Sequence, residues 1–193
     1  MDSETFAFDH CFWSMDEKDP KFAGQHVVFN SLGRDVLDRA FEGYNACIFA
    51  YGQTGSGKSY SMMGTQDTKG LIPRLCDNLF EQIVARNCES TNCEVEVSYM
   101  EIYNEKVRDL LDPNGKHNLK VREHKILGPY VDGLSTLAVS SYKDIENLMS
   151  EGNKSRTVAA TNMNSESSRS HAVFNMIITQ TLTDVQSGVR LRS

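Results

Sequence analysis

Residues 45–64 read NACIFAYGQTGSGKSYSMMG, an apolar run that gives way to a stretch rich in glycine. The apolar residues 46–51 predict a short strand that is buried on both faces. Residues 52–59, which follow, satisfy the pattern GxxxxGK[ST] between a predicted strand and a predicted helix. Glycines let the backbone turn tightly and point several N–H groups inward, next to a helix N-terminus, which suits a polyphosphate ligand. The stretch therefore predicts a phosphate-binding loop within an α/β fold.

Three residues at the end of this loop have separate predicted roles. Lys58 is expected to reach the β and γ phosphates of a nucleotide, and the Ser59 hydroxyl is expected to bind Mg²⁺. Tyr60 could stack on a purine, or it could be a core tyrosine at the start of the helix. The competing interpretation is a glycine-rich turn that binds nothing, and the spacing and the strand–helix context favour the nucleotide.

Composition narrows the class of protein. The chain has 193 residues, 39% of them hydrophobic and 24% charged, as expected for one globular domain or part of a larger one. A net charge of -6 argues against general nucleic-acid binding. Because there is no membrane-length apolar run and no basic leader, we expect a cytoplasmic protein without membrane insertion. The five cysteines form no CxxC pair, so neither a disulfide framework nor a zinc site is indicated.

Strand and helix patterns alternate along the chain, which indicates an α/β layered fold around a mostly buried sheet. Ser141 and Asp144 match a capping box at the start of one helix. The predicted strands are residues 6–13, 46–51, 94–103 and 171–182. The predicted helical segments lie over residues 29–41, from inside the glycine-rich stretch onward, after Pro73, over residues 107–111 and around residues 145–149.

Two polar segments are further candidates for function. Residues 164–171, NSESSRSH, collect hydroxyls, an amide and a guanidinium in a predicted loop, where a γ-phosphate sensor or an ordinary surface loop could lie. Residues 116–125, KHNLKVREHK, are basic in an acidic chain. That segment is either a solvated loop or hairpin, or a patch that contacts an acidic partner.

Together with SYMEIYNEKVRDLL and NKSRTVAATNMN, these segments closely resemble the kinesin motor domain, essentially from end to end. FDHCFWSMD and LKVREHKILGPYVDGL are most similar to the third kinesin family, whose members carry vesicles with an N-terminal motor. The resemblance implies a P-loop NTPase of the kinesin three-layer α/β type with a mixed central sheet. It also implies hydrolysis of ATP with Mg²⁺, movement along microtubules and a cytoskeletal location.

The resemblance assigns roles to particular positions. Ser168 is similar to the serine that meets Mg²⁺ and the γ-phosphate, Asn164 and Ser167 to groups that order the attacking water, and Arg169 to the arginine that pairs with a switch II glutamate. These lie in residues 164–171, which match switch I. The phosphate loop is Gly52, Gln53, Thr54, Gly55, Ser56, Gly57, Lys58 and Ser59, with Tyr60 as the adenine-stacking residue. The segment that touches β-tubulin in kinesins is matched by Lys116, Lys120, Arg122, His124 and Lys125.

Both ends of the sequence depart from the family pattern. A kinesin motor opens with a strand that ends in an RxRP-like element and later contains DLAGSE, whereas this chain opens with MDSETFAFD and closes with TDVQSGVRLRS. We therefore expect residues 1–193 to be a partial motor domain without switch II that is catalytically incompetent alone. In the kinesin sheet the strand at residues 46–51 lies between two strands that come later in sequence, so its ladder partners are expected to be missing.

Two alternatives remain open at this point. The chain could be a truncated isoform that binds nucleotide or tubulin without catalysis. It could also be an unrelated P-loop enzyme such as a nucleotide kinase, although such enzymes do not need the NxxSSRSH loop. Vesicle cargo would be bound only through regions outside these residues.

Overall fold

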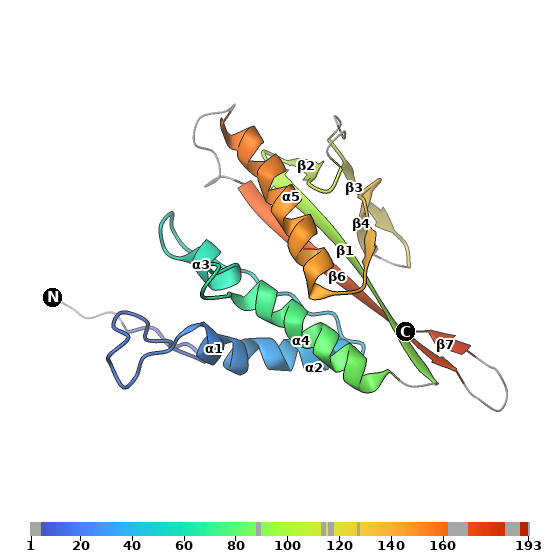
Figure 1. Cartoon of the computed structure of the whole chain (residues 1–193). Coiled ribbons are helices and arrows are strands. Elements are labelled where there is room, and N and C mark those ends of the chain that lie inside the picture. The colour runs from blue at the N-terminus through green and yellow to red at the C-terminus, as the bar shows by residue number, and fades with distance from the viewer. Residues whose placement is uncertain are drawn as a thin grey trace. The chain divides into compact units, whose positions relative to one another are not determined.

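The structure is a computed structural model, and it describes residues 5–87, 90–112, 115, 118–126, 128–161, 170–183 and 190–192. Side chains are described for these residues except 157–161 and 192. The chain divides into two compact units, Met1–Leu75 and Cys76–Ser193, and Figure 1 labels most of the helices and strands of both. Helix α4, Leu71–Arg86, contains the boundary.

The first unit is helical. Helix α1 (Gln25–Val28), the π-helical turn η1 (Phe29–Gly33) and helix α2 (Arg34–Phe41) follow one another without a break. Phe29, Leu37 and Phe41 are buried at the predicted helical spacing, so the helix predicted over residues 29–41 is confirmed. It begins earlier than predicted, at Gln25, and a short helix α3 (Lys58–Met62) follows the glycine-rich stretch as predicted.

Two predicted strands of this unit are wrong as strands. Residues 6–13 form a single bridge, from Trp13 to Phe22, and residues 46–51 pair with no other described segment. Residues 46–51 are also not buried, because Phe49 is 80% and Tyr51 is 95% exposed. A strand is defined by its hydrogen-bonded neighbour, and the apolar sequence alone cannot supply one.

The second unit is built on a sheet around strand β1 (Thr91–Tyr103). One edge of β1 pairs along its whole length with β6 (Ser170–Thr183), and all the ladders of this sheet are antiparallel. The other edge pairs with β2 (Lys106–Asp109) and with β5 (Leu137–Val139). Strand β6 pairs on its far side with β7 (Arg190–Arg192). The strands predicted at residues 94–103 and 171–182 are therefore confirmed.

The helical turn predicted over residues 107–111 is wrong. Asn104 and Glu105 have φ values of 46° and 61°, in the left-handed region, and they turn the chain back along β1. Val107 consequently pairs with Ile102 and is buried as part of strand β2. Two adjacent residues with positive φ are typical of a tight β-hairpin, so the turn overrides the helical spacing of the apolar residues.

Helix α5 (Tyr142–Thr161) runs beside the sheet in Figure 1 and buries Ile145 and Met149. Its predicted capping pair is present, because the Asp144 N–H donates to Ser141 Oγ over 3.2 Å. The Asp144 carboxylate in turn accepts hydrogen bonds from Ser140, from N at 3.0 Å and from Oγ at 2.9 Å. The hydrogen bonds that the carboxylate accepts from Ser140, and then the one with the Ser141 side chain, hold the pKa of Asp144 below its usual value.

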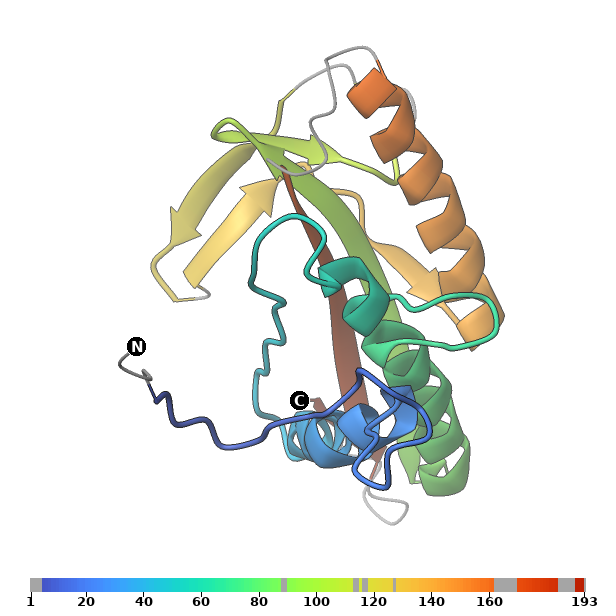
Figure 2. The ribbon, with the colours of Figure 1, turned by 90° about the vertical axis from the view of Figure 1, so that its left-hand side faces the viewer.

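The basic segment around residue 120 folds as a hairpin. Strand β3 (Lys120–His124) pairs antiparallel with β4 (Gly128–Asp132), and Figure 2 shows these two strands as a pair separate from the five-stranded sheet. An isolated bridge between Val107 and Leu119 connects the hairpin to β2. Residues 120–124 are thus one strand of a hairpin. Among the described residues, no helix is long and apolar enough to cross a bilayer.

Candidate functional site

Three glycines in residues 52–57 have positive φ values. Gly52, Gly55 and Gly57 have φ values of 150°, 82° and 87°, which side chains with a Cβ rarely adopt. A Cβ on Gly52 would also lie 2.5 Å from Ser56 Oγ, so the loop closes tightly over this glycine. Ser56 N donates to Gln53 O at 3.2 Å, which stabilises the turn from within.

Lys58 folds back over the loop that precedes it. Its Nζ donates to Gly52 O and to Gln53 O, each over 2.8 Å. The ammonium is therefore held at the mouth of the loop by two uncharged oxygens. Charged phosphate oxygens bind an ammonium more strongly than carbonyls do, so this arrangement fits a polyphosphate that takes over the contact.

Helix α3 places the next two candidate residues. Lys58, Ser59 and Tyr60 are its first three residues, and Tyr60 is half exposed. The helix is five residues long, and helices this short are marginal without tertiary support. That support includes Gln25, whose Nε2 donates to the Tyr60 carbonyl over 2.7 Å. This role of Gln25 was not predicted, because the residue stands in a polar stretch of the sequence that matches no motif.

Of the predicted switch I segment, residues 164–171, the structure describes Ser170 and His171 at the start of β6. Asn164, Ser167, Ser168 and Arg169 lie outside the described residues. The phosphate loop belongs to the first unit and Ser170 to the second. The structure therefore gives the geometry of each part separately.

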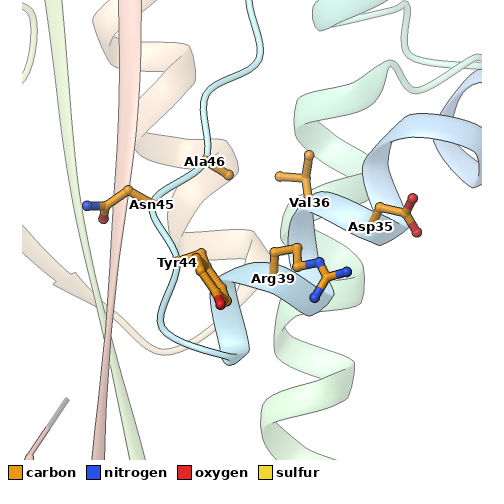
Figure 3. A pocket seen from close by; sticks show the side chains of 6 residues that line it. All are labelled: Asp35, Val36, Arg39, Tyr44, Asn45 and Ala46. Carbon is orange, nitrogen blue, oxygen red and sulfur yellow. The ribbon is translucent and has the colours of Figure 1, made fainter. Parts of the chain in front are cut away.

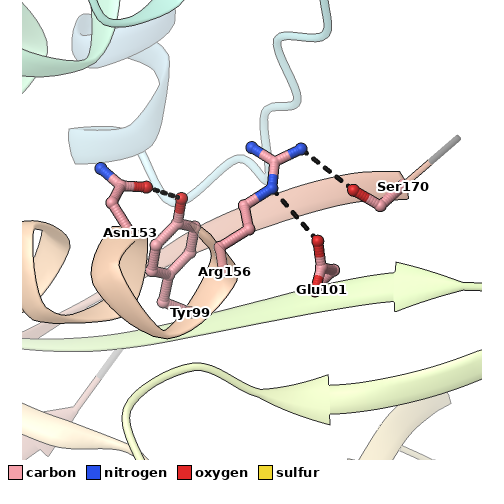
Figure 4. Close-up of polar contacts among 5 residues, drawn as sticks. All are labelled: Tyr99, Glu101, Asn153, Arg156 and Ser170. Carbon is pink, nitrogen blue, oxygen red and sulfur yellow. Dashed lines mark hydrogen bonds and ion pairs between the residues drawn. The ribbon is translucent and has the colours of Figure 1, made fainter. Parts of the chain in front are cut away.

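A polar cluster that includes Ser170 was not predicted. Arg156 of α5 donates from Nε to Glu101 Oε1 of β1 and from a terminal nitrogen to Ser170 Oγ, each over 3.2 Å (Figure 4). Tyr99 donates from its hydroxyl to Asn153 Oδ1 over 2.8 Å, one turn earlier on the helix. The cluster ties α5 to β1 and to the first residue of β6.

Burial governs the electrostatics of this cluster. Glu101 is 7% exposed, and its carboxylate is paired with the Arg156 guanidinium. Burial also raises the pKa of the Tyr99 phenol, an effect that the nearby Arg156 charge partly offsets. The phenol is therefore a stable hydrogen-bond donor at neutral pH, and the cluster is structural in character.

Four of the five residues predicted to contact a microtubule are described, and they lie in or next to strand β3 of the hairpin. Lys120, Arg122, His124 and Lys125 are all exposed, and Lys116 lies outside the described residues. Arg122 Nε contacts Asp132 Oδ2 across the two strands over 2.6 Å, so part of its charge is paired. Both side chains are at least half exposed, so this ion pair contributes little to stability.

A pocket of about 430 Å³ lies in the first unit, at the end of α2 (Figure 3). It contains none of the predicted site residues, and Arg39 in its lining already pairs with Glu42 over 2.7 Å. The full lining is Asp35, Val36, Arg39, Tyr44, Asn45 and Ala46. Within the described part of the chain, no group of three or more His, Cys, Asp or Glu residues could hold a metal ion.

Comparison with known proteins gives consistent relatives. The kinesin-like protein KIF13A of Mus musculus is 73% identical over 187 residues, which are 96% of this chain and 11% of that protein. The kinesin-like protein unc-104 of Caenorhabditis elegans is 62% identical over 179 residues, which are 91% of this chain and 11% of that protein. The chain thus spans about a tenth of the length of the curated relatives it matches.

Solved structures support the fold. A KIF14 dimer in a two-heads-bound state, with AMP-PNP and in complex with a microtubule, superposes with a TM-score of 0.86 at 51% identity, covering 97% of this chain and 54% of that chain. A fast kinesin superposes with a TM-score of 0.80 at 44% identity, covering 88% of this chain and 48% of that chain. The predicted α/β fold of the kinesin type is thereby confirmed.

The family profile of the kinesin motor domain matches residues 1–192. This match spans the glycine loop, the α5 cluster and the basic hairpin described above. The chain therefore belongs to the kinesin motor-domain family, and its relatives KIF13A and unc-104 are members of the third kinesin family that the sequence resembles.

Proposed function

We propose that this chain carries the ATP-binding part of a motor that hydrolyses ATP to move along microtubules. The observation that carries the proposal is the loop of residues 52–57, with three glycines at positive φ leading into Lys58, in a chain of the kinesin family. The KIF14 structures to which the chain is similar are described as complexes with a microtubule and with AMP-PNP or ADP. A cytoplasmic location on microtubules follows from the same proposal.

The loop residues have distinct roles in this proposal. Backbone N–H groups of residues 52–59, apart from the Ser56 N–H that donates to Gln53 O, cradle the phosphates. Lys58 exchanges its two carbonyl contacts for phosphate oxygens. Ser59 and Ser168 are the residues whose hydroxyls would hold Mg²⁺, and the ion would supply charge neutralisation at the phosphates. Tyr60, half exposed beside the loop, stacks on the adenine.

Replacing Lys58 tests the nucleotide assignment. In a whole kinesin motor domain carrying this sequence, we expect Lys58→Ala to reduce microtubule-stimulated ATP turnover about a hundredfold or more, because catalysis of phosphoryl transfer is mainly positioning and electrostatic stabilisation. Lys18→Ala removes the same charge from an exposed loop of the same unit and should have no effect. Near-normal phosphate release by the Lys58 variant would refute the assignment.

The switch I residues complete the proposed chemistry. We propose that Ser168 meets Mg²⁺ and the γ-phosphate, that Asn164 and Ser167 order the attacking water, and that Arg169 pairs with a glutamate of switch II. Ser168→Ala should then slow single-turnover hydrolysis strongly while leaving ADP affinity nearly unchanged. An equal loss in both quantities would mean that the serine is structural.

The β3–β4 hairpin is the proposed contact with tubulin, chiefly its β subunit. Lys120, Arg122, His124 and Lys125 are exposed on it, and Lys116 precedes it in sequence. Exposed charge pairs contribute about 0.2–1 kcal/mol each, so replacing Lys120 and Lys125 by Ala should weaken microtubule affinity by a few fold. The loss should shrink at high salt, and it should be absent in Lys143→Ala, a change on an exposed position of α5. Unchanged affinity at low salt would remove the hairpin from the interface.

A second candidate for the 193-residue polypeptide by itself is binding of nucleotide or tubulin without turnover. Residues 46–51 make no ladder with any described segment and expose Phe49 and Tyr51. Typical domains are stable by only about 5–15 kcal/mol, so uncovered apolar side chains can remove much of that. We propose that the isolated polypeptide is catalytically incompetent and is not a stable ATPase.

Two measurements decide between these candidates. Cooperative thermal unfolding of the isolated polypeptide, together with tight binding of Mg²⁺-ATP by calorimetry, would favour the binding module. Transcript sequencing past the codon for Ser193 tests the isoform directly, since an in-frame continuation into VDLAGSE would remove it.

A further inference from the structure

Gln25 is a buried polar residue of the first unit for which the proposed chemistry has no role. It is the first residue of α1 and is 8% exposed, and burial of an amide side chain is costly unless it is hydrogen bonded. Its Nε2 donates over 2.7 Å to the backbone carbonyl of Tyr60, which lies 35 residues later in the sequence. The contact therefore joins two helices of this unit, and one of them carries the phosphate-loop lysine.

The accepting carbonyl needs such a partner. In a continuous α-helix, the Tyr60 carbonyl would accept from the N–H of Gly64, four residues on. Here the Gly64 N–H is directed to Ser59 O at 3.3 Å, and Met63 N also donates to Ser59 O, at 2.8 Å. The carbonyl of Tyr60 is thus one of those at the C-terminal end of α3 that the helix itself leaves unpaired, and Gln25 satisfies it.

This contact acts on helix α3, which is too short to be stable without tertiary contacts. Helix α3 has five residues, so few backbone hydrogen bonds hold its conformation against the nucleation cost of a helix. At its C-terminal end the following loop is closed by Gly70 N, which donates to Met63 O over 2.9 Å. Gln25 adds a side-chain hydrogen bond from outside that loop. It acts at Tyr60, which stands two residues after Lys58.

We propose that Gln25 is a positioning residue for nucleotide binding, which holds α3 in place through the Tyr60 carbonyl and so presets Lys58 and Ser59 for the phosphates. The proposal rests on the proposed function of the phosphate loop. Gln25 itself touches neither nucleotide nor metal in this assignment. Its effect is preorganisation, because a loop already held in its binding conformation loses less entropy when the ligand arrives.

Preorganisation predicts a particular kinetic pattern. When the anchor is removed, part of the binding energy must be used to order α3, so the Kd for Mg²⁺-ADP and the KM for ATP rise. Once phosphates are bound they hold Lys58 and the loop amides themselves, so kcat changes little. A residue that matters only for overall stability would instead lower the melting temperature and the active fraction, with Kd unchanged in the molecules that remain folded.

The test uses Gln25→Met, which keeps the length and volume of the side chain and removes the donor. In a whole kinesin motor domain carrying this sequence, we expect Kd for Mg²⁺-ADP to rise about fivefold, the change that corresponds to one ordinary hydrogen bond of about 1 kcal/mol. The KM for ATP should rise by a similar factor and kcat should stay within about twofold. The matched control is His26→Ala, an exposed change at the next position of the same helix, which should leave all three constants unchanged.

A second readout does not depend on nucleotide. Amide hydrogen exchange at Ser61 and Met63, which donate to Gly57 O and Ser59 O, should be faster in Gln25→Met than in the parent protein without ligand. Unchanged exchange and unchanged Kd in Gln25→Met would overturn the proposal. If instead Lys58→Ala binds Mg²⁺-ADP normally, the phosphate-loop function itself fails, so the two failures are distinguishable.

Discussion

The ion pair between Arg156 and Glu101 gives a prediction whose size can be worked out from the structure. The Arg156 side chain is 28% exposed and the Glu101 side chain is 9% exposed. Arg156 Nε and Glu101 Oε1 lie 3.2 Å apart. Removing one member of a fully buried pair costs about 3–5 kcal/mol, because the other charge is left without a partner. Arg156 retains some contact with water but also donates to Ser170, so we expect Arg156→Met to cost about 2–4 kcal/mol.

A second ion pair on the same helix serves as the control that isolates the effect of burial. Lys143 pairs with Glu146 on the outside of α5, where the two side chains are 71% and 46% exposed. Exposed pairs of this kind contribute about 0.3–0.5 kcal/mol, so Lys143→Met should be nearly neutral. The difference between the two variants therefore measures burial and not merely the loss of a positive charge from α5.

The assay is urea unfolding of a whole motor domain carrying this sequence, with the double variant Glu101→Gln, Arg156→Met completing a cycle. Because the double variant leaves no buried charge, it should be more stable than the sum of the two single changes implies, by about 1–3 kcal/mol. An Arg156→Met cost no larger than that of Lys143→Met would refute the reasoning. Additive effects in the cycle would do the same, since they would show that the two groups do not interact.

Three further outcomes follow from single contacts. Gly152→Ala should destabilise by about 1–2 kcal/mol in chemical unfolding, because the new methyl would lie 2.5 Å from the Tyr99 ring and overpacking outweighs the roughly 1 kcal/mol gain in helix propensity. Asp144→Asn should be less stable than the parent at neutral pH, and the difference should fade as pH drops below about 4, because a lowered carboxyl pKa stabilises only while the group is ionised. Burial raises the pKa of Cys76 to about 12, so iodoacetamide at pH 8 should label the exposed Cys47 in the folded protein and Cys76 only after unfolding.

Local patterns predicted the parts of the fold that depend on local interactions. The alternation in residues 94–103 and the capping pair of Ser141 and Asp144 fix one strand and one helix start, and both are observed. Glycines in the stretch that ends at Gly57 predicted a tight loop, and their φ values are those that only glycine adopts easily. The cap and the loop depend on interactions that span a few residues, so the sequence predicts them directly. The strand is predicted by its alternation, although its longest ladder is made with the distant strand β6.

Two predictions made from apolar spacing alone were wrong. The apolar residues 46–51 have the composition of a buried strand, yet a strand exists only where another segment pairs with it, and none of the described segments does. The helical turn predicted over residues 107–111 failed for a local reason. Their apolar spacing fits a helical turn, but the positive φ of Asn104 and Glu105 directs the chain back to β1, and pairing with β1 decides the outcome.

The contacts that support the site were invisible in the sequence because they join positions far apart. Gln25 and Tyr60 are separated by 35 residues, and Glu101 and Arg156 by 55. Neither pair belongs to a ligand-binding pattern, because each acts on the backbone or on a neighbouring element and not on a phosphate. The two differ in what they hold: Gln25 orients a five-residue helix, whereas Arg156 joins a 20-residue helix to two long strands. A short helix can shift without unfolding the unit around it, so loss of Gln25 should appear in nucleotide affinity, whereas loss of Arg156 should appear in the free energy of unfolding.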